Sequence, residues 1–208
     1  MKTIFRRAAY IILAVAAASC AKAVVEGTNE AEKRYFDAWM KKNHPLLESV
    51  GLGIYVLEET DSTEETADTV KADGYILAEY TITDLEGNIS SYTGKEAAKQ
   101  LGTYDTTTYY GPKVLTTFEN AIQAGVAEAV IGMKVGSRKK VIIPGWLMTY
   151  SSYDSEEEYI KKATAGSHVI YDITITDFAD TIEYWEKEQI QKYFDANTVE
   201  FGDKDTSD

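Results

Sequence analysis

The sequence predicts an α+β fold built around one hydrophobic core. The segments Gly74 to Thr83 and Val169 to Thr176 alternate apolar and polar side chains, as strands do. Amphipathic helices are predicted over Glu30 to Asn43 and Glu183 to Ala196. The chain has 208 residues, 44% of them hydrophobic and 12% aromatic, which is enough for one well-buried domain with short extensions.

The first twenty residues have the pattern of an export signal. Lys2, Arg6 and Arg7 are positive, and the apolar run from Ala8 to Ala18 is too short to span a bilayer. The run leads to Cys20, the only cysteine, directly after small residues. This pattern resembles a bacterial lipobox, which implies a signal peptide over residues 1–19 and a lipid on Cys20. The alternative is an ordinary secretory cleavage beside an incidental cysteine.

The charge of the chain limits its partners. Loss of residues 1–19 would remove three positive charges and no negative charge, so the formal net charge would change from −13 to −16. Because an acidic protein repels the phosphate backbone, nucleic-acid binding is not expected. A lipidated Cys20 would attach the protein to a membrane of the bacterial cell envelope, facing the periplasm or the outer surface. A chain with a single cysteine forms no internal disulfide.

Turn residues and periodicity divide the N-terminal half into elements. Pro45 stops the first helix, and the turn Asp84 to Asn88 joins two strands as a hairpin. The predicted order is a helix over 30–43, a strand over 52–57, an acidic loop over 58–68, a strand over 74–83, a strand from 89, a short helix over 95–101 and a polar connection over 102–110.

Two capping boxes and one glycine organise the C-terminal half. Thr116 and Glu119 have capping-box spacing and predict a helix that ends before Gly132, where a residue with positive φ is favoured. Ser155 and Glu158 repeat the capping box. The predicted order is a helix over 118–131, a turn at 136, a strand over 141–143, a short helix over 159–163, a strand over 169–176 and a helix over 183–196.

The motifs between Val70 and Phe178 occur in an order that is typical of one protein family. They are Tyr80-Thr81 before the acidic turn, Gly132-Met133-Lys134-Val135-Gly136 before three basic residues, Ile142-Ile143-Pro144 with Leu147, and Val169-Ile170-Tyr171-Asp172-Ile173. In this order they resemble the FKBP-type peptidyl-prolyl cis-trans isomerases. The helix around Tyr35, followed by GLGIYVLEET, looks like the N-terminal extension of lipoprotein members from Bacteroidetes-type bacteria.

The resemblance implies a particular version of the α+β fold. Family members have a strongly bent antiparallel sheet wrapped around one short helix, and here the predicted terminal helices would flank that domain. The implied organisation is a signal peptide over 1–19, a tether, helix and leading strand over 20–69, the FKBP-like domain over 70–178, and a C-terminal helix and tail over 179–208.

The resemblance also implies an activity that needs no nucleophile, metal or cofactor. Amide resonance sets a barrier of about 18–20 kcal/mol to rotation of a peptide bond. A dry aromatic pocket between helix and sheet would favour the twisted state of an X-Pro bond, through hydrogen bonds that form best in that state. The expected partners are therefore X-Pro segments of other envelope proteins, and the expected role is assistance in protein folding.

The family pocket can be carried onto this sequence position by position. The candidate catalytic residues are Tyr80, Tyr171 and Tyr150, and the candidate substrate-binding residues are Ile122, Gln123, Val126, Ser91 and Tyr110. At Gln123 the implied group is the backbone N–H, which holds a substrate carbonyl. Val126 stands where the family has a tryptophan, and Ser90 and Ser91 stand where it has a phenylalanine and an aspartate. Thr149 occupies the loop tyrosine position, one residue before Tyr150.

Alternatives remain open at this point. With this pocket the protein could be a catalytically weak module that binds peptides or a partner, or an inert domain that forms a homodimer through its flanking helices. Tyr80 and Tyr171 could also be sheet-core residues without a ligand. His44 and His168 lack metal-ligand spacing, and the acidic run from Asp154 to Glu158 lacks that of a calcium loop, so no metal site is expected.

Overall fold

The computed structural model describes residues 28–201, and Cys20 lies outside these residues, together with the predicted signal peptide. The helices are α2 (Glu30–Asn43), α3 (Lys95–Gln100), α4 (Ala124–Val130), the 3-10 turn η1 (Gly145–Leu147), α5 (Glu156–Lys162) and α6 (Ile182–Phe201). The strands are β1 (Tyr55–Thr60), β2 (Tyr75–Thr83), β3 (Ile89–Tyr92), β4 (Lys113–Thr116), β5 (Arg138–Ile143) and β6 (Val169–Ala179).

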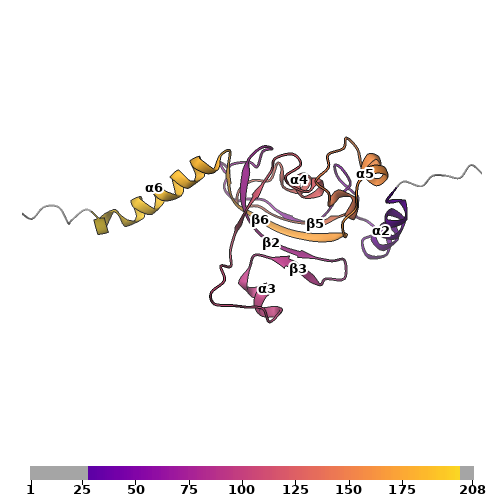
Figure 1. Ribbon diagram of the computed structural model, residues 1–208, viewed down its shortest axis with the longest axis horizontal. Coiled ribbons are helices and arrows are strands. Elements are labelled where there is room, and N and C mark those ends of the chain that lie inside the picture. Colours follow the sequence, from indigo (N-terminus) through magenta and orange to yellow (C-terminus); the bar gives the residue numbers. More distant parts are fainter. Residues whose placement is uncertain (1–27, 202–208) are drawn as a thin grey trace, which may run out of the picture.

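The strands form one antiparallel sheet of six strands, so the predicted α+β class is confirmed (Figure 1). The spatial order is β1-β5-β6-β2-β3, and β4 also pairs with β2. Each pairing is antiparallel. Within residues 28–201, none of the helices has the length and hydrophobicity needed to cross a membrane.

The pair β2 and β6 forms the centre of the sheet. Its register sets Tyr80 opposite Ile173 and Ile82 opposite Tyr171. Residues at every second position on these strands face the core, and Ile76, Ala78, Ile173 and Ile175 are at most 1% exposed. Both strands agree with the predicted segments, and β6 continues beyond the prediction to Ala179.

Helix α4 packs on the core side of the sheet and needs a glycine to do so. A Cβ atom added to Gly125 would lie 2.3 Å from Ile143 Cγ2 and 2.9 Å from Leu147 Cβ. This close approach buries Val126, which is 2% exposed. The predicted end of the helix is confirmed, because Gly132 follows it with a φ of 90°.

The predicted start of this helix at residue 118 is wrong. Thr116 is the last residue of β4, a strand that the sequence analysis did not identify, and its hydroxyl accepts the N–H of Phe118 at 3.1 Å. Asn120 has a φ of 60°, in the left-handed region, so a right-handed helix cannot run through it. Thr116 and Glu119 have the spacing of a capping box, but the threonine makes a local turn instead.

Strand β1 runs to Thr60, where the sequence suggested an acidic loop. A carboxylate oxygen of Glu59 lies 3.0 Å from Lys139 Nζ, and one of Glu58 lies 3.0 Å from an Arg138 nitrogen. These basic residues lie on the neighbouring strand β5. Because charges of opposite sign face each other across the two strands, an acidic segment here remains in the sheet.

Helix α2 covers one end of the core, and its predicted bounds are confirmed. Phe36 is completely buried. Its ring centroid lies 4.7 Å from that of His168, 5.4 Å from that of Trp146 and 5.7 Å from that of Tyr55. Met40 is also buried, at 5% exposure. The helix therefore belongs to the hydrophobic core of the domain.

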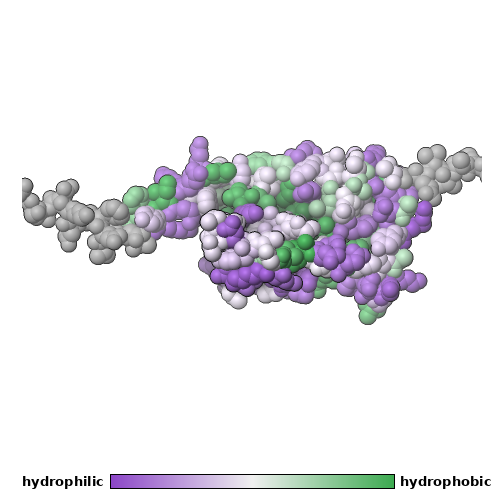
Figure 2. All heavy atoms as spheres, turned by 60° about the horizontal axis from the view of Figure 1, so that its bottom comes forward, coloured by the Kyte–Doolittle hydropathy of each residue, from purple (hydrophilic) through white to green (hydrophobic). Residues whose placement is uncertain are grey.

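Helix α6 extends away from the sheet at the opposite end of the molecule from α2 (Figure 1). Near its start, Trp185 Nε1 donates a hydrogen bond to Asp177 of β6 at 2.7 Å. Farther along, Ile190 and Phe194 are 56% and 50% exposed. Figure 2 shows hydrophobic side chains at the surface of this helix. The two flanking helices therefore do not pack against each other within one molecule.

Candidate active site

Two of the candidate tyrosines lie together on the central strands. The ring centroids of Tyr80 and Tyr171 are 5.5 Å apart, with 45° between the ring planes. Tyr171 is opposite Ile82, and Tyr80 lies two residues before Ile82, so both side chains are on the core side of the sheet. Ser91 of β3 is also opposite Ile82 and shares this side. The register of three strands thus assembles one wall.

The Tyr171 hydroxyl lies in a largely apolar environment but remains partly exposed to solvent. Tyr171 is 6% exposed. The Tyr171 hydroxyl makes no hydrogen bond with the described residues. In that part of the chain, Trp146 Nε1 is the one side-chain polar atom that is both fully enclosed and without a partner, so the Tyr171 oxygen is not fully enclosed. The Tyr171 oxygen therefore reaches the surface. Burial raises the pKa of Tyr171 well above the ordinary value, and the nearby phenols of Tyr80 and Tyr150 raise it further.

The loop after η1 brings Tyr150 to the rim of this wall. Gln123 Nε2 donates a hydrogen bond to the Tyr150 hydroxyl at 3.1 Å. The neighbouring backbone is held by a hydrogen bond from the N–H of Ala124 to the carbonyl of Thr149 at 2.9 Å. Tyr150 is 55% exposed. It therefore lies at the edge of the site, with its phenol directed by Gln123.

Gln123 places an unused backbone donor at the start of α4. Its φ and ψ of −65° and 139° are extended, and its carbonyl accepts the N–H groups of Val126 at 3.0 Å and Ala127 at 2.9 Å. The N–H of Gln123 itself has no recorded partner within residues 28–201. The first N–H groups of a helix lack partners inside the helix. This donor is available to a ligand carbonyl.

The remaining candidates have different positions. Ile122 is 8% exposed and lies directly before Gln123. Val126 belongs to the buried core. Tyr110 lies in the connection between α3 and β4, where its hydroxyl accepts the N–H of Asp105 at 3.0 Å. Its ring stacks on that of Tyr104, with 5.4 Å between centroids. The structure thus brings Tyr80, Tyr150, Tyr171 and Gln123 together and places Tyr110 in a separate aromatic cluster.

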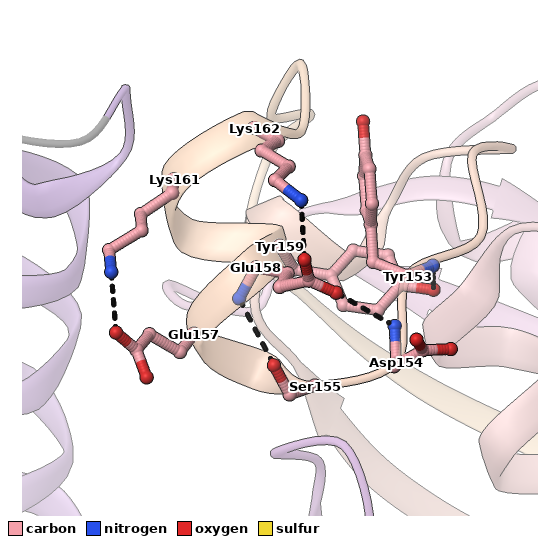
Figure 3. A network of polar contacts seen from close by, with 8 residues as sticks. All are labelled: Tyr153, Asp154, Ser155, Glu157, Glu158, Tyr159, Lys161 and Lys162. Carbon is pink, nitrogen blue, oxygen red and sulfur yellow. Dashed lines mark hydrogen bonds and ion pairs between the residues drawn. The ribbon is translucent and has the colours of Figure 1, made fainter.

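Helix α5 supports the loop that carries Tyr150, and its predicted N-cap at Ser155 is confirmed, although the Glu158 carboxylate bonds the residue before the cap (Figure 3). The Ser155 hydroxyl accepts the N–H of Glu158 at 3.4 Å, and the Glu158 carboxylate accepts the N–H of Asp154 at 3.2 Å. Ion pairs also join Glu157 to Lys161 and Glu158 to Lys162 along the same helix.

Tyr159 anchors the same loop, a role that the sequence analysis missed. This residue is 1% exposed, and its hydroxyl accepts the N–H of Tyr153 at 3.1 Å (Figure 3). The rings of Tyr153 and Tyr159 meet edge to face, with 5.0 Å between centroids. The only available signal was an aromatic residue on the inner side of a short amphipathic helix, and this gives no bonding partner.

The candidate site combines aromatic surface with unused hydrogen-bond donors. Tyr80 and Tyr171 offer aromatic surface, which favours contact with an apolar group. The Gln123 N–H and the Tyr171 hydroxyl offer donors that are not used within the described residues. This combination suits non-covalent binding of a peptide group.

Comparisons with known proteins gave matches among solved structures. No protein-family model matches the chain, and no curated protein sequence matches it. The chain is similar to the crystal structure of FkpA from Escherichia coli, with 16% identity and a TM-score of 0.45 over 85% of this chain and 70% of that chain. It is also similar to a peptidyl-prolyl cis-trans isomerase from Pseudomonas syringae pv. tomato, with 16% identity and a TM-score of 0.46 over 74% of this chain and 98% of that chain. The α+β fold itself follows from the strand order and register.

Proposed function

We propose that this protein is a peptidyl-prolyl cis-trans isomerase of the FKBP type that assists protein folding. The observation that carries the proposal is the ring contact between Tyr80 and Tyr171, together with the unused N–H of Gln123. All three were expected from the family resemblance, and they come from three separate segments of the chain. Tyr80 and Tyr171 are in ring contact, and Gln123 is hydrogen-bonded to Tyr150, whose phenol lies near Tyr171. These contacts support a function that uses the residues together.

The geometry suggests how the site would lower the rotation barrier. The pyrrolidine ring of a substrate would rest on Tyr80 and Tyr171, and the Gln123 N–H would donate to a carbonyl of the same peptide. An X-Pro bond loses its resonance as it twists, so exclusion of water from its carbonyl favours the twisted state. Hydrogen bonds that are stronger in the twisted state would add to the effect. A lowering of the barrier by about 4 kcal/mol accelerates isomerisation roughly a thousandfold.

A protease-free assay of cis-to-trans relaxation on short X-Pro peptides tests this function. The wild type is expected to accelerate relaxation, and Tyr80→Ala is expected to lower kcat/KM at least about tenfold, because it removes half of the aromatic wall. Tyr92→Ala is the matched control, since Tyr92 lies opposite Thr81 and points to the other side of the sheet. An uncatalysed rate with wild-type protein at micromolar concentration, or an equal loss in both variants, contradicts the proposal.

A second candidate function is peptide binding without catalysis. It is favoured by Val126, which is buried where the family resemblance implies a tryptophan, and by Ser90, which stands where the resemblance implies a phenylalanine. Both changes reduce the apolar surface available to a proline ring. Binding of an X-Pro peptide by the wild type, with no acceleration in the relaxation assay, would identify this function.

We also propose that the protein is a lipoprotein of the cell envelope, anchored through Cys20. The support is the positive, apolar and small-residue sequence that precedes this cysteine. Replacement of Cys20 by serine is expected to move the protein from the membrane fraction to the soluble fraction. Continued membrane association of the Cys20→Ser protein contradicts the anchor.

A homodimer through a flanking helix is a further proposal, supported by the exposed Ile190 and Phe194 on α6. Because α2 and α6 lie at opposite ends of the molecule, neither can bury the apolar side of the other within one chain. Gel filtration before and after removal of residues 180–208 tests the role of α6. If the full chain is a dimer and the truncated chain is a folded monomer, α6 forms the dimer contact. An unchanged oligomeric state excludes this role of α6.

A further inference from the structure

A hollow lies along α4, next to the loop that carries Tyr150. Its volume is about 550 Å³, within the range of roughly 300–1,000 Å³ that is usual for ligand pockets. Ile122 and Tyr150 both line it. We name this hollow the α4 trough. Tyr150 also lies at the edge of the candidate site, so the trough adjoins that site on the Tyr150 side.

The floor of the α4 trough consists of small and aliphatic side chains. Ala124, Ala127 and Ile131 lie three and four residues apart, so they share one face of the helix. Leu52, from the loop before β1, also lines the trough. Ile131 is 41% exposed, which is high for a large aliphatic residue. This floor suits the backbone and the aliphatic part of an extended peptide.

The sides of the α4 trough carry negative charge without compensation. Asp73, Glu119 and Glu128 line it, and its described lining contains no Lys, Arg or His. None of the three has a recorded ion pair within residues 28–201, whereas Glu59 and Asp172 pair with cations on β5. The trough is therefore complementary to a positively charged ligand.

The placement of these carboxylates favours a long cation over a metal ion. Asp73 precedes β2, Glu119 precedes α4, and Glu128 is on α4 itself. In the described part of the chain, no group of three or more His, Cys, Asp or Glu side chains could hold a metal ion. Lysine and arginine combine a charged end with an aliphatic stem that packs on apolar surface. Such a side chain matches both the floor and the sides of the trough.

We propose that the α4 trough selects peptides that carry Lys or Arg within a few residues of the proline. The proposal rests on the proposed function, because it places the proline itself at Tyr80 and Tyr171. The trough would hold the adjoining residues of the same chain, with the basic side chain over Ala127 and its charge near Glu119 or Glu128. Substrate choice would then depend on charge, while the bond rotation takes place at the tyrosines.

Peptide affinities of the full chain test the proposal. The probes are blocked, labelled peptides with one Leu-Pro bond and with Lys, Ala or Glu placed three residues before or three residues after the proline. At low salt, one Lys peptide is expected to bind at least about tenfold more tightly than its Glu counterpart, and high salt should reduce the ratio. In the double variant Glu119→Gln/Glu128→Gln the ratio should fall below about threefold. The double variant Glu79→Gln/Glu183→Gln changes the net charge equally at exposed positions away from the trough and should keep the wild-type ratio.

The outcomes separate this proposal from the proposed function. Equal affinities for Lys and Glu peptides, with catalysed isomerisation of both, overturn the trough proposal and leave the isomerase in place. An equal loss of the ratio in both double variants also overturns it, because the preference would then come from net charge. A Lys preference that depends on Glu119 and Glu128, without any acceleration of relaxation, supports charge selection by the trough and contradicts the isomerase.

Discussion

Two aromatic groups on the core side of the sheet have similar ring spacings but different surroundings. Phe36, Trp146 and His168 meet beneath α2 at 4.7 to 5.7 Å between centroids, and Phe36 and Trp146 are at most 1% exposed. Tyr80 and Tyr171 meet at 5.5 Å beside a rim residue that is 55% exposed, with donors that the described residues leave unused. Ring contact alone therefore does not distinguish a core from a site, and neither does an unpaired polar atom, because Trp146 Nε1 in the first group also lacks a partner among the described residues. The exposure of the surrounding residues is what differs between the two groups.

Removal of the Phe36 ring should have the largest effect on folding. Phe36→Ala would leave a cavity between α2 and the sheet, and truncation of a buried phenylalanine lowers the free energy of unfolding by about 3–5 kcal/mol. Urea denaturation followed by tryptophan fluorescence measures the change. Tyr35→Ala on the same helix is the control, because Tyr35 is 55% exposed and should cost much less. Equal costs would show that α2 does not close the core.

Removal of single tyrosine hydroxyls compares the stability contribution of a hydroxyl that is hydrogen-bonded with that of one that is not. Tyr159→Phe leaves the N–H of Tyr153 without its partner and should lower the free energy of unfolding by about 1–3 kcal/mol. Tyr171→Phe removes a hydroxyl with no recorded bond within residues 28–201 and should change it by less than about 0.5 kcal/mol. Denaturation curves of the two variants measure both changes in the free energy of unfolding. A larger loss in Tyr171→Phe would mean that its hydroxyl supports the fold.

A smaller, pH-dependent effect is expected at His168. Its Nδ1 accepts the N–H of Gly145 at 2.9 Å, and burial lowers the pKa of His168 below the ordinary value of 6.5, against the opposing effect of Glu32. The folded state therefore binds fewer protons than the unfolded state, so this stabilisation is complete above pH 6.5 and is lost as the pH falls through the folded pKa.

Paired denaturation of wild type and His168→Gln at neutral and mildly acidic pH measures this contribution, because the other titrating groups are common to both proteins. The stability advantage of the wild type should shrink as the pH falls. An advantage that is constant or increases on acidification would contradict the neutral, buried state of His168.

The sequence was sufficient where one local pattern decides the structure. Helix α2, the strands β2 and β6 and the cap at Ser155 were predicted correctly, because periodicity or capping determines each of them. The start of α4 and the end of β1 were not. Asn120 takes a left-handed conformation within a local turn that resembles a capping box in sequence. Glu58 and Glu59 stay in the sheet through cations on β5, which is a tertiary contact.

The candidate site was predictable in part for the same reason. Tyr80 and Tyr171 lie in motifs that carry the family resemblance, and Gln123 was mapped onto the sequence through that resemblance. The position of Tyr150 depends on the path of a loop. The α4 trough could not be read from the sequence, because Asp73, Glu119 and Glu128 come from three segments and each looks like an ordinary surface carboxylate. Only the fold brings these three residues to the same hollow.

The most direct test of the central claim is an NMR titration of the protein with a Leu-Pro peptide and with the same peptide carrying alanine in place of proline. The prediction is that the backbone amide of Gln123 and the ring signals of Tyr80 and Tyr171 shift with the proline peptide and stay largely unchanged with the alanine peptide. Shifts confined to other parts of the protein, or equal shifts with both peptides, would show that these residues do not form a proline-binding site.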